Sequence, residues 1–227
     1  MPSAEKILYF LSSTVLNVIG VAVLGYGMSA KWASSKMACS PTSTDLFNGS
    51  GTISMGLFDG SEKACDRFDT GEKEIKVFDK MGEVGGAGVA LHALVVFLLV
   101  LALLASGGSI LITLYNTISN PYETYMGPIG LYVCSGLSAC LAFLAMVLYL
   151  INLLGINIAN KMLSQGFTGT LKDEVVTFLV GFFMILPYIV VNLVAILLVY
   201  LYAHAAYRQR QEQQKPTEDA PKEILMY

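Results

Sequence analysis

Four long apolar runs without a single Asp, Glu, Lys or Arg dominate this sequence of 227 residues. They cover approximately residues 7–28, 88–115, 127–154 and 175–206. A helix rises about 1.5 Å per residue, so about 20 apolar residues cross the hydrocarbon core of a bilayer. Each run is long enough, and the pattern predicts four transmembrane helices with both termini on the same side of the membrane.

The overall composition is typical of an integral membrane protein. Hydrophobic residues make up 55% of the chain and charged residues only 14%, whereas soluble domains carry about 25% charged residues. The formal net charge is -3, and a nucleic-acid-binding protein would instead present a basic face. We therefore expect no nucleic-acid partner.

The first apolar run has two possible interpretations, a retained helix and a cleaved signal peptide. Lys6 supplies a minimal positive region before the run. However, residues 7–28 exceed the apolar core of about 7–15 residues that signal peptides use, and Met28-Ser29-Ala30 is a poor cleavage site. We expect the helix to be retained.

The segment between the first two runs, residues 29–87, carries the sequence's indications of sidedness. Cys39 and Cys65 lie there, outside the apolar runs, together with the sequon Asn48-Gly49-Ser50. Cysteines in a polar loop form a disulfide if the loop faces an oxidising compartment; two free thiols are the alternative. Such a disulfide would stabilise the fold by roughly 3 kcal/mol. We expect an extracellular loop, a glycosylation site at Asn48 and cytosolic termini.

The same loop is too long to be a simple connector, and it contains strand-like stretches. Residues 52–55 and 74–78 are rich in β-formers or alternate polar with apolar residues. Trp32 follows the first span, where an indole with one wet edge is favourable. The predicted fold class is therefore an all-α membrane protein, a four-transmembrane-helix bundle with a small disulfide-stapled extracellular β-sheet over its mouth.

Polar residues inside the spans are few. Asn17 and Asn192 lie deep in the first and fourth spans, and interhelical hydrogen bonds are their plainest interpretation. His92 and His204 lie at opposite membrane faces. We expect His92 to be a hydrogen-bonded packing residue and His204 to lie at the interface. Pro187 is expected to kink the fourth span.

The sequence offers no support for catalysis or transport. We find no intramembrane charge, as a transporter would need, and no nucleophile elbow, phosphate loop or zinc-ligand spacing. We expect a protein that is not an enzyme, with no catalytic residue, cofactor or metal site.

The end of the chain differs from the spans. Residues 207–227 are polar and Gln-rich with two prolines, which predicts a disordered cytosolic tail after a transmembrane domain of residues 1–206. The chain ends in Ile224-Leu225-Met226-Tyr227. Leu225 and the free carboxylate of Tyr227 suit strand addition to a PDZ domain, and a plain hydrophobic end is the alternative.

Several stretches of the chain resemble the clarin family, distant relatives of the claudins and of the stargazin-type channel subunits. The loop residues that carry the resemblance are Trp32, Cys39, Asn48, Gly56, Leu57, Phe58 and Cys65. Phe58 stands where claudins have a second Trp. The stretches at residues 115–124 and 127–132 and the Met-Tyr terminus are also similar to clarins. The resemblance extends over essentially the whole chain, and it implies a claudin-like four-span fold.

The resemblance also implies a function. It suggests a non-enzymatic plasma-membrane organiser or adaptor of the kind found in sensory cells, which links membrane partners to the cytoskeleton. The expected partners are the lipid bilayer, proteins within the membrane, and a PDZ or actin-linked protein at the C-terminus. The alternatives are a claudin-like cell-junction protein and an auxiliary subunit of a channel or receptor.

Overall fold

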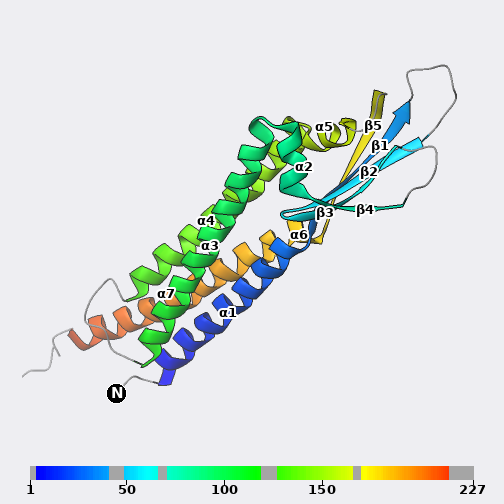
Figure 1. The fold of residues 1–227 in the computed structure, drawn as a ribbon. Helices are drawn as coiled ribbons and strands as arrows, with labels where there is room; N and C mark the ends of the chain where they lie inside the picture. The colour runs from blue at the N-terminus through cyan, green and yellow to red at the C-terminus, as the bar shows by residue number, and fades with distance from the viewer. Residues whose placement is uncertain (1–3, 41–48, 66–70, 119–126, 166–169, 215–227) are drawn as a thin grey trace, which may run out of the picture.

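The computed structural model describes residues 4–40, 49–65, 71–118, 127–165 and 170–214. Four long helices form an elongated bundle with a β-sheet at one end (Figure 1). These helices are α1 (Ala4–Ser29), α3 (Ala87–Ile118), α4 (Pro128–Leu150, continued by the π-helical turn Ile151–Gly155) and α7 (Ile185–Gln214). In the part of the chain that is described, four helical segments are long and apolar enough to cross a membrane, namely Ala4–Ser29, Ala87–Ile118, Pro128–Gly155 and Val180–Gln209.

The helices pack as a ring of four neighbours. Contacts join α1 to α7, α7 to α4, α4 to α3 and α3 to α1. Large apolar side chains on all four helices point outwards, among them Leu104, Leu111, Val133 and Val190, each more than half exposed. Soluble proteins rarely expose large continuous apolar surfaces to water. The apolar outer surface of the four helices is therefore expected to contact lipid. The prediction of a four-span membrane protein is confirmed.

The sheet is antiparallel and has five strands in the order β4-β3-β2-β1-β5. The strands are β1 (Lys31–Ser40), β2 (Gly49–Gly56), β3 (Asp59–Lys63), β4 (Lys73–Lys76) and β5 (Thr170–Phe178). The predicted strand at residues 52–55 lies within β2. The one at residues 74–78 ends at Lys76, because Val77 begins helix α2 (Val77–Val84).

The fourth span begins later than expected. The prediction that it begins at Val175 is wrong, because residues 175–178 belong to β5 and this strand pairs with β1, with Val176 opposite Ser35. A short helix, α6 (Val180–Phe183), then enters the bundle and is followed by α7. The helix is interrupted at Met184, three residues before Pro187, which has no N–H to donate to the carbonyl of Phe183.

The tail also starts later than expected. Helix α7 continues to Gln214, so the prediction of disorder from residue 207 is wrong for residues 207–214. Within this stretch the side-chain amide of Gln211 donates to the hydroxyl of Tyr207 at 2.7 Å. The long stretch of good helix formers after the span, with no Gly or Pro before Pro216, accounts for the extension.

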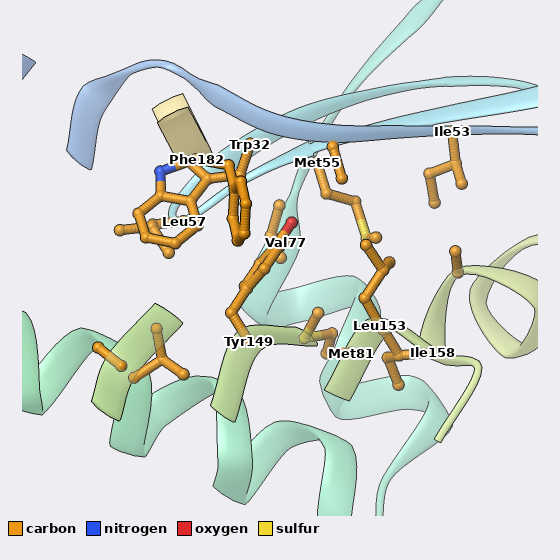
Figure 2. Packing of buried hydrophobic residues seen from close by; sticks show 14 of the residues in the cluster. Trp32, Ile53, Met55, Leu57, Val77, Met81, Tyr149, Leu153, Ile158 and Phe182 are labelled. Atoms are coloured by element: carbon orange, nitrogen blue, oxygen red, sulfur yellow. The ribbon is translucent and has the colours of Figure 1, made fainter. Parts of the chain in front are cut away.

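Two short helices close the space between the sheet and the bundle. They are α2 and α5 (Ile158–Ser164), and the second follows Asn157, whose φ of 53° places it in the left-handed region. Residues from the strands and from these helices meet in one buried cluster (Figure 2). A partly buried ion pair, Lys80 to Glu62 at 2.8 Å, joins α2 to β3. The sheet is therefore fixed to the bundle by a continuous core.

Candidate interaction site at the junction of the sheet and the bundle

Trp32 lies at the centre of the junction. Strand β1 starts two residues after α1 ends, so its second residue turns back over the end of the helix. The indole Nε1–H donates to the carbonyl of Gly27 at 2.7 Å, and the side chain is completely buried. The expectation of an indole with one wet edge is therefore wrong, because the last turn of α1 supplies the acceptor that water was expected to supply.

Two further aromatic rings surround this indole. The ring of Tyr149 on α4 lies 4.8 Å from it and that of Phe182 on α6 lies 6.1 Å from it, both edge to face. Figure 2 shows the three rings converging from a strand and two helices. A Cβ on Gly181 would lie 2.5 Å from Trp32 Cδ1, so α6 approaches the indole as closely as it does only because residue 181 is glycine.

The Gly56-Leu57-Phe58 segment leads from β2 to β3, and each of its residues lies close to another part of the junction. A Cβ on Gly56 would lie 3.1 Å from the carbonyl oxygen of Ala30, beyond the end of α1. The carbonyl of Leu57 accepts a hydrogen bond from His92 Nε2 of α3 at 2.9 Å. The carbonyl of Phe58 accepts one from the N–H of Val77 at 2.9 Å, and its ring is 45% exposed. His92 is thus a hydrogen-bonded packing residue, as predicted.

Cys39 and Cys65 form the predicted disulfide, with their Cα atoms 6.0 Å apart. The bond runs from β1 to the residues after β3 and crosses β2, where a Cβ on Gly51 would lie 2.8 Å from Cys65 Sγ. Both cysteines are buried. The disulfide therefore closes the end of the sheet that lies away from the bundle.

Between the spans, the polar contacts differ from the predicted ones. Asn17 and Asn192 each donate their side-chain N–H to a carbonyl four residues earlier in their own helix, Ser13 and Tyr188. The interhelical interpretation of both asparagines is therefore wrong. Their Oδ1 atoms are buried without a partner among the described residues.

Interhelical hydrogen bonds in the bundle come instead from Asn152, which donates to the carbonyl of Gly88 on α3 at 3.1 Å, and from hydroxyl groups that were not predicted to have this role. The hydroxyl of Tyr188 on α7 bonds Ser138 on α4, lies 2.7 Å from Ser106 Oγ on α3, and donates to the carbonyl of Ala102 at 3.2 Å. Ser106 and Ser138 also bond one another at 2.9 Å. One residue thus links three helices by hydrogen bonds.

Some predicted site residues cannot be placed. Asn48, Leu225 and Tyr227 lie outside the described residues. Over the described part of the chain, no group of three or more His, Cys, Asp or Glu side chains could hold a metal ion.

Three of the junction residues, Trp32, Gly56 and Leu57, are among those that carry the family resemblance. Residues 4–164 match the family described as Clarin-2-like. Over their full lengths, the chain is 33% identical to Clarin-3 of Mus musculus and 31% identical to Clarin-3 of Homo sapiens, with 100% of both chains covered in each comparison. This chain belongs to the clarin family. In this clarin-family protein, Trp32, Gly56 and Leu57 hold the sheet on the bundle, the two cysteines close the far end of the sheet, and Phe58 is partly exposed.

Proposed function

We propose that this clarin-family protein is a plasma-membrane organiser that holds a rigid outer sheet at a fixed position above the bilayer and binds cytoskeleton-linked partners on the cytosolic side. The observation that carries the proposal is the buried junction of Trp32, Tyr149 and Phe182. A sheet packed in this way moves together with the helices beneath it. A partner bound to the sheet is therefore held at a fixed position relative to a partner bound at the other end of the bundle.

The orientation is part of the proposal. The start of α1 and the end of α7 lie at one end of the bundle and the sheet at the other (Figure 1). The sheet contains the Cys39–Cys65 disulfide, which persists in an oxidising compartment. We therefore assign the sheet to the extracellular side and both termini to the cytosol, with residues 1–206 as the membrane domain.

The orientation is tested in intact cells that express the chain with an epitope at the N-terminus. We expect antibody to reach the epitope only after permeabilisation. We also expect glycosidase to shift the wild-type chain on a gel but not the Asn48→Gln variant. Labelling of the N-terminal epitope in intact cells would reverse the assignment.

The adaptor role is tested by affinity capture in mild detergent followed by mass spectrometry. Three forms are compared: the full chain, a chain lacking residues 225–227, and a chain with one glycine added after Tyr227. PDZ domains capture a terminal carboxylate, so the added glycine displaces that group while keeping every native residue. We expect a PDZ or actin-linked partner with the full chain alone. If all three forms capture the same proteins, the tail does not carry the function.

A further inference from the structure

A cavity of about 630 Å³ lies on the outer side of the sheet, between the end of α1 and strands β3 and β4. Five of the residues that line it are charged. They are Lys31, Lys76, Asp59, Glu72 and Glu74, and Ser29 lies at its edge towards the helix. Neither the disulfide nor the aromatic junction forms part of this cavity.

The charges of the cavity are fixed by the register of the sheet. Asp59 lies opposite Lys76, and Ser61 lies opposite Glu74. These residues alternate with Gly60 and Ile75, so their side chains share one face of the two strands. Lys31 Nζ donates to Ser61 Oγ at 2.8 Å, which holds the ammonium group over the same face. Within the described residues no ion pair joins these lysines to these carboxylates, so both kinds of charge are available to a ligand.

The cavity lies at the end of the first membrane-spanning helix, where the surface of the bilayer is expected. Ser29 is the last residue of a membrane-spanning helix, and its hydroxyl donates to the carbonyl of Tyr26 at 2.9 Å. Tyr26 is 58% exposed. Phe58, the neighbour of Asp59 in sequence, is 45% exposed. Exposed aromatic side chains at the end of a span are typical of the headgroup region.

We propose that this cavity binds the headgroup of a zwitterionic phospholipid from the leaflet that faces the sheet, with a primary ammonium as in phosphoethanolamine. Lys31 and Lys76 supply cations for the phosphodiester, and Asp59, Glu72 and Glu74 supply acceptors for the ammonium group. This inference goes beyond the organiser role, because it assigns a lipid ligand to the outer sheet.

The lining favours a primary ammonium over the other common headgroups. Quaternary ammonium groups are recognised by aromatic cages, and among the residues that the structure describes, no aromatic side chain lines this cavity. A primary ammonium carries three N–H donors, which match carboxylate and hydroxyl acceptors. A headgroup with an additional carboxylate would bring a further negative charge beside the three acidic side chains, and one without an ammonium would leave those acids without a cationic partner in the ligand.

The test is native mass spectrometry of the full-length protein with phosphatidylethanolamine, phosphatidylcholine and phosphatidylglycerol of identical acyl chains. The variants are Asp59→Asn and Glu74→Gln, alone and combined. Glu83→Gln is the matched control, because Glu83 is an exposed acid on α2 outside the cavity. Retention of the Cys39–Cys65 disulfide and an unchanged elution volume confirm that each variant is folded.

We expect the wild type to retain phosphatidylethanolamine in preference to both other lipids. Each cavity substitution should weaken this retention about two- to fivefold, as for exposed ion pairs, and Glu83→Gln should leave it unchanged. Equal retention of the three lipids, or equal losses in the cavity variants and the control, would overturn the proposal. Displacement of the lipid by equimolar glycerophosphoethanolamine would show that a free phosphodiester is the ligand and that the membrane assignment is wrong.

Discussion

The indole Nε1–H of Trp32 donates a hydrogen bond to the carbonyl oxygen of Gly27, five residues earlier in the chain, at 2.7 Å. The last four carbonyl groups of a helix accept no hydrogen bond from within the helix, so they need donors from elsewhere. Trp32 satisfies one of them and at the same time fills the space between α4 and α6. A single side chain therefore caps the C-terminal end of the first span and fixes the start of the sheet beside it.

This relationship predicts the effect of Trp32→Phe. Phenylalanine keeps an aromatic ring but removes the N–H, so the carbonyl of Gly27 stays buried without that donor. We expect a loss of about 1–3 kcal/mol in the free energy of unfolding, measured in mixed micelles. Tyr26→Phe is the control, because Tyr26 is 58% exposed, and it should change stability by less than about 0.5 kcal/mol. Equal effects of the two substitutions would contradict the assigned role of the indole.

Gly181 allows a second test of the same junction. In Gly181→Ala the new methyl group would meet the Trp32 ring and the carbonyl oxygen of Lys31 at 2.8 Å. Overpacking of this kind should destabilise the protein by about 1–3 kcal/mol.

The matched control is Gly25→Ala, where a Cβ has nothing within 4 Å. Since alanine is the better helix former, this change should be neutral or stabilising by up to about 1 kcal/mol. Thermal unfolding of the purified variants separates the two results. A melting temperature for Gly181→Ala at or above that of Gly25→Ala would show that α6 can move away from Trp32.

The spans and the disulfide could be predicted because each leaves a local signal in the sequence: uncharged apolar runs, and two cysteines in one polar loop. Strand β5 was missed for a related reason. Its last residues, 175–178, are uncharged and mostly apolar and lead through Leu179 into α6, so they could not be separated from the span by hydropathy. Strand β1 begins two residues after α1, with no Gly or Pro between them to mark a boundary.

The contacts between helices could not be predicted, because they depend on how each helix is rotated about its axis. Ser106, Ser138 and Tyr188 come from three different helices and meet only in the folded bundle. Asn17 and Asn192 are the more polar side chains and were predicted to join the helices, yet both donate to carbonyls of their own helices. The burial of the Trp32 indole depends on α4 and α6, which come much later in the chain, so it could not be predicted from the residues around Trp32.

The disulfide predicts a measurable stabilisation of the sheet. Replacing both Cys39 and Cys65 by serine should cost about 2–5 kcal/mol, because the loop between them gains freedom in the unfolded chain. Non-reducing peptide mapping of the wild type should recover the two residues linked. Cys140→Ser is the control, since Cys140 is exposed and unpaired, and it should leave the melting temperature unchanged. Wild-type stability that does not respond to reduction would contradict the prediction.

The hydroxyl of Tyr188 and the side chain of Asn192 predict opposite effects, although they lie one helical turn apart on α7. Tyr188→Phe removes hydrogen bonds to Ser106, Ser138 and the carbonyl of Ala102. Measured intramembrane hydrogen bonds contribute about 0.6 kcal/mol on average and up to about 1.7, so we expect a loss of about 1–2 kcal/mol. Asn192→Leu removes a buried Oδ1 that has no partner among the described residues, so it should be neutral or stabilising. Equilibrium unfolding in mixed micelles tests both, and a larger loss for Asn192→Leu than for Tyr188→Phe would show that the asparagine, not the tyrosine, holds the helices together.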